Sequence, residues 1–437
     1  MMKFGNKLFT MMQAGAEAYA RWEIESSLEI LQNRKKLLTL LAFCLPIVAF
    51  IGAAWAAPDV LGSKEAYAPA FYSTSVFLVS ILIGLAAGLI TGCIGAGGGF
   101  VTTPALMSMG VKGILAVGTD LFHIFAKAIM GTVIHRKLGN VSLKLAVAFV
   151  IGSTGGVVVG GTLNRAIYEF NPILSDLFIS LVYVLLLGFL GTYSMMDFLR
   201  LWRAGRAHRT LAPEEQQATA APLVTTTGLA QKLQSFRIPP MITFDEDLVP
   251  GGNRISGIFV ALCGASVGLV ASIMGVGGGF LTFPMFVYLL GVSSFTTVGT
   301  DILQIIYTGG FAAISQYAIY GFIFYTLAMG LLLGSLVGIQ VGALTTNVVK
   351  GMYIRGFFAI TIIAGFVDRL FALPRKLSQM EIIPIPTEIT KVLDLIGTIV
   401  FFMIIACFGF WVFFMFFKNL YKLRGMESPS QPGVKGA

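Results

Sequence analysis

The stretch Gly95-Ala96-Gly97-Gly98-Gly99-Phe100-Val101-Thr102-Thr103-Pro104 interrupts a long apolar region. A close copy, Gly275-Val276-Gly277-Gly278-Gly279-Phe280-Leu281-Thr282-Phe283-Pro284, returns about 180 residues later. Three successive glycines allow a helix to open, and the proline suits the first turn of a restarted helix or a kink. A pair of glycine-rich breaks within apolar helices is typical of the substrate site of a secondary transporter.

The composition predicts an all-α polytopic membrane protein. Of 437 residues, 56% are hydrophobic and only 12% are charged, whereas soluble domains carry about 25% charged residues. Apolar runs of about 20 residues, long enough for a helix to cross a bilayer, recur along the chain. The net charge of +9 comes without a basic stripe interleaved with aromatics, so we expect no nucleic-acid partner. The four cysteines lack metal-site spacing, and we expect neither a metal nor a cofactor.

The apolar runs fall into two groups of five, with one additional transmembrane helix at each end. The expected divisions are an amphipathic cytoplasmic segment 1–36, a helix 37–57, a first repeat 75–198, a cytoplasmic linker 199–254, a second repeat 255–370 and a last helix 393–417. The run 37–57 ends in small residues like a signal peptide. The long region before it favours an uncleaved helix.

The two groups are an internal repeat. Val117-Gly118-Thr119-Asp120 returns as Val298-Gly299-Thr300-Asp301, and the glycine ladder 152, 156, 160 returns as 334, 338, 342. Such ladders favour close helix packing. An odd number of segments in each repeat gives the two repeats opposite topology, the symmetry that alternating access uses. Segments 97–111 and 277–292 are short, and we expect broken or half-depth helices there.

Charge predicts the orientation. With a cytoplasmic N-terminus, most of the 30 lysines and arginines fall in inner loops, as expected for a protein of the cell inner (plasma) membrane. The loop 368–392 is the exception, because it places Arg369, Arg375, Lys376 and Lys391 on the outer side.

Ionisable residues occur within one apolar segment. Asp120, His123 and Lys127 are spaced i, i+3, i+7 and share one helix face. Lys127 can pair with Asp120 or face an anionic substrate. His123 can contact substrate, transfer a proton or bond to a neighbouring helix. The corresponding face of the second repeat carries Asp301, Gln304 and Thr308. Both aspartates can lock a helix start or couple protons.

The candidate substrate site combines open backbone with these polar faces, because freed N–H groups at a restarted helix bind anions. Its expected members are Gly97, Gly98, Gly99, Thr102, Thr103, His123, Lys127, Gly277, Gly278, Gly279, Thr282, Gln304 and Thr308. The alternative reading of the glycines is close helix packing alone.

The phrases Gly97–Pro104 and Val117–Asp120, with their second copies, resemble those of the sulfite exporter TauE/SafE family. The resemblance covers about 75–200 and 255–415. It implies movement of sulfur-containing or carboxylate anions, such as sulfite, sulfonates or sulfoacetate, across the bacterial inner membrane. The N-terminal region and the linker 199–254 exceed the compact family pattern.

We therefore expect a secondary transporter of a small anion, with sulfite or an organosulfonate as the leading substrate. An enzyme is not expected, because the chain lacks a nucleophile elbow, a His-Glu-x-x-His motif and a phosphate-binding loop. Two alternatives are an anion channel and a membrane scaffold or sensor that signals through 199–254. The sequence leaves homo-oligomerisation open.

Overall fold

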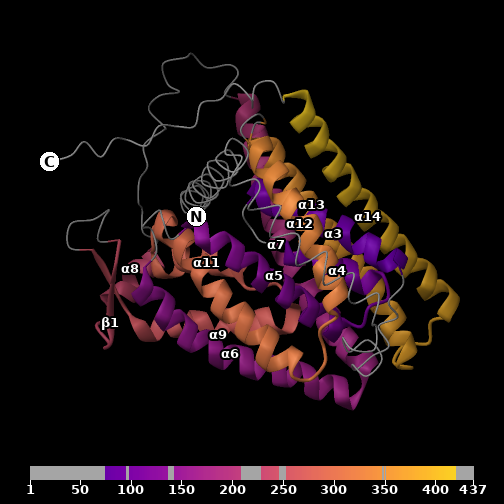
Figure 1. The fold of residues 1–437 in the computed structure, drawn as a ribbon, viewed down its shortest axis with the longest axis horizontal. Coiled ribbons are helices and arrows are strands. Elements are labelled where there is room, and N and C mark those ends of the chain that lie inside the picture. The colour runs from indigo at the N-terminus through magenta and orange to yellow at the C-terminus, as the bar shows by residue number, and fades with distance from the viewer. Residues whose placement is uncertain are drawn as a thin grey trace.

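A computed structural model describes residues 74–94, 98–135, 142–207, 228–245, 252–346, 349 and 351–419. The predicted segments 1–36 and 37–57, and Gly97, lie outside the described residues. The described part is almost wholly helical (Figure 1), and seven of its helices are long and apolar enough to cross a membrane. The predicted fold class, an all-α polytopic membrane protein, is confirmed.

The helices follow the order of the apolar segments. The first half contains α3 (Thr74–Ile94), α4 (Gly99–Ser108), α5 (Gly113–His135), α6 (Leu143–Phe170) and α7 (Pro172–Ala207). The second half contains α9 (Gly257–Met274), α10 (Gly279–Pro284), the π-helical turn η3 (Met285–Leu290), α11 (Ser294–Phe311), the π-helical turn η4 (Ala312–Ala318), α12 (Tyr325–Thr346) and α13 (Gly351–Gln379). The last helix is α14 (Thr387–Lys418).

The glycine ladders bring helices from the two halves together. α3 packs along α12, and α6 packs along α9. An ideal Cβ on Gly156 of α6 would lie 2.8 Å from Leu269 N of α9, and one on Gly338 of α12 would lie 2.8 Å from Leu89 N of α3. The missing side chains therefore permit close backbone approach. The pairing is reciprocal, since the first helix of each half packs against the fourth helix of the other.

The segments expected to be short are short. α4 has 10 residues, which span about 15 Å at 1.5 Å per residue, half of a hydrocarbon core of about 30 Å. The corresponding segment of the second half is α10 followed by η3, with six residues each. Before α10 the chain leaves helical geometry, because Gly275, Gly277 and Gly278 have φ angles of 80°, 68° and 84°. Only glycine adopts this left-handed conformation freely.

Part of the region between the halves folds against the second half. It contains α8 (Gly228–Ser235) and an antiparallel hairpin of β1 (Met241–Phe244) and β2 (Asn253–Ser256). Gln234 Nε2 donates to Leu290 O at 2.9 Å. Asp245 accepts from Ser293 N at 2.8 Å and from Ser293 Oγ at 2.6 Å. Because Ser293 is the N-cap of α11, this carboxylate holds the turn between η3 and α11.

Figure 1 shows two groups of helices that come together at one end of the molecule. One group contains α6, α9 and α11, and the other contains α3, α12, α13 and α14. They converge toward the connection between α13 and α14 at the lower right, whereas α8 and β1 lie at the far left. The two ends of the protein are therefore built from different segments.

Candidate functional site

The two polar faces predicted from sequence lie on α5 and α11, which pack against each other. Asp120 is the eighth residue of α5, and Asp301 is the eighth residue of α11. His123 and Gln304, three residues further on, are both fully buried. Polar groups inside a bilayer must bond within the protein, so the partners of these side chains define the site.

A chain of polar contacts runs from α4 through α5 of the first half to α12 of the second half. Thr103 Oγ1 donates to Asp120 Oδ2 at 3.0 Å. His123 Nδ1 lies 3.2 Å from Asp120 Oδ1, and its Nε2 lies 3.0 Å from Ser335 Oγ. His123 thus makes the contact with a neighbouring helix that was one of its three expected roles. This contact joins the two halves.

The second half contains a similar chain in which Gln304 and Thr308 stand where the first half has His123 and Lys127. Gln304 Nε2 donates to Asp301 Oδ1 at 2.7 Å and to Thr282 Oγ1 at 3.2 Å. Thr308 Oγ1 donates to Gln304 Oε1 at 3.0 Å and lies 2.8 Å from Ser153 Oγ of α6. Each face therefore keeps its aspartate, and only the face on α5 adds a histidine and a lysine.

Lys127 places a cation within the same face of α5. Its Nζ donates to Thr91 Oγ1 of α3 at 3.2 Å, and its side chain is only partly buried. The Thr91 hydroxyl in turn donates to Ala87 O at 2.8 Å. A lysine inside an apolar segment requires a polar partner or a wet environment, which makes this position a functional candidate.

Each aspartate lies beside the first residue of the short helix in its own half. An ideal Cβ on Gly99 would lie 3.1 Å from Asp120 Oδ2, and one on Gly279 would lie 3.2 Å from Asp301 Oδ2. Gly98 and Gly278 are the N-caps of these helices. The carboxylates lie about two turns inside α5 and α11 and face the positive ends of α4 and α10.

The hydroxyls expected to face a substrate are used within their own helices. Thr102 Oγ1 donates to Gly98 O at 3.1 Å, and Thr282 Oγ1 donates to Gly278 O at 3.0 Å. Both side chains are fully buried. Thr103 is hydrogen-bonded to Asp120 on the polar face of α5.

The second glycine-rich break lies against α4 and α5 of the first half. An ideal Cβ on Gly99 would lie 2.9 Å from Val276 Cα, and one on Gly275 would lie 2.9 Å from Thr103 Oγ1. One on Gly277 would lie 2.7 Å from Ile124 Cγ2. The structure therefore brings Thr103, which bonds to Asp120, next to the break of the opposite half.

The threonines of the duplicated Gly-Thr-Asp phrases also join the halves. Thr119 Oγ1 accepts from Phe324 N, just before α12, at 3.0 Å. Thr300 Oγ1 accepts from Ser142 N, the N-cap of α6, at 3.1 Å. Free N–H groups at a helix start need acceptors. Each phrase therefore supplies one acceptor to the opposite half.

Several polar residues at the site were missed by sequence reasoning. Tyr183 Oη donates to Met274 O at 2.5 Å, and the Tyr317 hydroxyl donates to Ser272 O. These bonds hold the last carbonyls of α9 where the break begins. Ser153 and Ser335 had a usable signal, because each directly follows a ladder glycine. The two tyrosines had none. Among the described residues, no group of His, Cys, Asp and Glu is arranged to hold a metal.

Comparisons with known proteins agree with this architecture. Residues 80–368, about two thirds of the chain, match the family described as sulfite exporter TauE/SafE. The probable membrane transporter protein YjnA of Bacillus subtilis is 25% identical, over 60% of this chain and 87% of that protein. YdhB of the same species is 24% identical over 66% and 99%, and a probable membrane transporter protein of Xylella fastidiosa is 24% identical over 61% and 84%. No solved structure shows a significant match. The chain therefore belongs to the sulfite exporter TauE/SafE family and is a multi-pass membrane transporter.

Proposed function

We propose that this transporter moves a small anion, sulfite or an organosulfonate such as sulfoacetate, by alternating access across the bacterial inner membrane. The observation that carries the proposal is the buried polar face of α5. Asp120, His123 and Lys127 lie on one helix between two glycine-rich breaks, and they contact α3, α4 and α12. The cost of such groups in a membrane favours a functional reason for them.

Lys127 supplies the positive charge that selects an anion. An ammonium group offers three donors and no acceptor, which suits a compact group with several oxygens. Thr91, bonded to Lys127 Nζ, marks the α3 side of the same position. The equivalent residue of the second half is Thr308. The proposed site therefore has a charged side chain on α5 and a neutral one at the matching position of α11.

The reciprocal contacts between the halves support alternating access by two inverted repeats. His123 of the first half bonds to Ser335 of the second, and Thr308 of the second bonds to Ser153 of the first. When such related contacts exchange between two states, a site near the bilayer midplane opens to one side and then the other. The charge pattern of the loops favours a cytoplasmic N-terminus.

Binding of an anion panel tests this proposal. We would compare sulfite, sulfate, thiosulfate, taurine, sulfoacetate and acetate by thermal shift of purified protein at fixed ionic strength and pH. One sulfur anion should raise the unfolding temperature, because a ligand that binds only the folded state stabilises it. The shift should vanish in Lys127→Met and persist in Lys391→Met, which removes an exposed lysine of α14. An unchanged shift in Lys127→Met would remove Lys127 from the site.

A further inference from the structure

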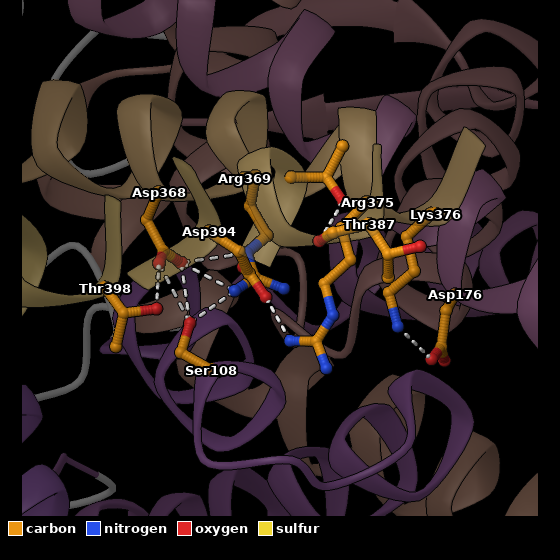
Figure 2. A network of polar contacts seen from close by, with 10 residues as sticks. Ser108, Asp176, Asp368, Arg369, Arg375, Lys376, Thr387, Asp394 and Thr398 are labelled. Atoms are coloured by element: carbon orange, nitrogen blue, oxygen red, sulfur yellow. Dashed lines mark hydrogen bonds and ion pairs between the residues drawn. The ribbon is translucent and has the colours of Figure 1, made fainter. Parts of the chain in front are cut away.

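A buried charged cluster joins the last residue of α4 to α13 (Figure 2). Ser108, the last residue of α4, donates to both carboxylate oxygens of Asp368 at 2.9 Å. Arg369 Nε donates to Asp368 Oδ2 at 2.9 Å, and its Nη2 donates to Ser108 Oγ. Asp368 is 0% exposed and Arg369 is 2% exposed. Thr398 of α14 adds a longer contact to Asp368, at 3.4 Å.

A second connection at the same end involves α7. Lys376 Nζ of α13 lies 2.9 Å from Asp176 Oδ2. The other oxygen of Asp176 accepts from Gly113 N, the first residue of α5, at 2.7 Å. Asp176 therefore ties the start of α5 to α13, just as Ser108 ties the end of α4 to α13. Both connections cross from the first half to the second.

Two further ion pairs involve only α13 and α14. Arg375 Nη1 pairs with Asp394 at 2.5 Å, and Lys391 Nζ pairs with Glu388 at 2.9 Å. The four cations that made 368–392 an exception to the charge pattern are thus located in α13 and α14, and each has a carboxylate partner.

The chemistry of the crossing contacts suits a joint that opens. A buried ion pair contributes little net stability compared with apolar packing of the same size, because both charges lose water. Polar partners that separate into water regain hydration, whereas separated apolar surfaces do not. Ser108, at the end of α4, lies five residues after Thr103, which bonds to Asp120 on the polar face of α5.

We propose that Ser108, Asp368 and Arg369, together with Asp176 and Lys376, form a gate that closes the α13–α14 end of the transporter. The gate must open for the substrate to reach that side of the membrane. The two helix groups of Figure 1 converge at this end, in agreement with a closed gate. The proposal rests on the proposed transport by alternating access.

Thiol accessibility tests the gate without any substrate. Thr102→Cys, a buried reporter on α4, is introduced after Cys44, Cys93, Cys263 and Cys407 are replaced. A membrane-impermeant thiol reagent is applied to right-side-out and to inverted vesicles. Loss of one partly exposed ion pair should raise the fraction of molecules with an open gate by about fivefold, because the pair stabilises only the closed state. Lys376→Ala and Ser108→Ala should each raise the labelling rate about fivefold from one side of the membrane.

Lys376→Arg keeps the ion pair and should label at the parental rate, as should Lys391→Ala, whose pair lies within α14. All variants are checked for a monodisperse gel-filtration peak. A rate in Lys376→Ala and Ser108→Ala equal to that of Lys391→Ala overturns the gate. The labelling assay needs no anion, so its result is independent of the anion-binding result. Unchanged labelling would count against the gate alone, and absence of anion binding would count against the anion site alone.

Discussion

Two adjacent glycines on α6 should respond oppositely to the same substitution. Gly156 faces α9, where an ideal Cβ would lie 2.8 Å from both Ala265 C and Leu269 N. Gly155 faces away, and a Cβ there meets no atom within 4 Å. The perturbation is therefore one methyl group, placed either inside or outside the interface between the halves.

The magnitude follows from these distances. Ordinary contacts begin at 3.4 Å, and the added Cβ would overlap Ala265 O, so Gly156→Ala must move the helices apart by more than about 1 Å along an interface that runs the length of α6. Overpacking of this kind costs about 1–3 kcal/mol. Gly155→Ala carries no such cost, and replacing glycine by alanine in a helix stabilises by up to about 1 kcal/mol.

The free energy of unfolding is measured for both variants and the parent by SDS titration in mixed micelles. Gly156→Ala should fall below the parent, and Gly155→Ala should equal or exceed it. Equal values for the two variants would refute the ladder as the determinant of helix packing between the halves.

Two further predictions concern contacts that involve the Gly-Thr-Asp phrase and the region before α9. Thr119→Val leaves Phe324 N without its acceptor in the protein interior and should lower the free energy of unfolding by about 1–3 kcal/mol. The control Thr192→Val changes an exposed site whose hydroxyl bonds to its own helix, and it should cost less than about 0.5 kcal/mol. Equal costs for the two variants would contradict the role of Thr119. Asp245→Ala removes the carboxylate at the start of α11 and should cost about 1 kcal/mol. Amide hydrogen exchange at 293–297 should become faster, and unchanged exchange there would show that Asp245 does not hold this turn.

Sequence patterns predicted the architecture because membrane spans depend on local composition. A run of about 20 apolar residues specifies a crossing helix whatever it packs against. Likewise, the spacing of Asp120 and His123 on one helix face follows from helical geometry alone, and the structure joins them at 3.2 Å. The glycine runs predicted an opened helix, and before α10 the structure shows this opening as a left-handed backbone that glycine adopts freely.

Contacts between distant segments were not predictable in the same way. The partner of His123 is Ser335, more than 200 residues later, and only the packing of α5 against α12 places them together. The docking of Asp245 at α11 and of Lys376 at Asp176 also depends on tertiary arrangement. Serines beside ladder glycines were a usable local signal, since matched positions in two repeats are expected to have matched roles.

The proposed carrier places Lys127 in the path of the anion. This role is measured by uptake of radiolabelled sulfite and of radiolabelled sulfoacetate into proteoliposomes over a range of concentrations. The parent and Lys391→Met should take up one of these anions with saturation, and correctly folded Lys127→Met should lose this uptake. Uptake by Lys127→Met equal to that of the parent, or a flux that never saturates, would contradict it.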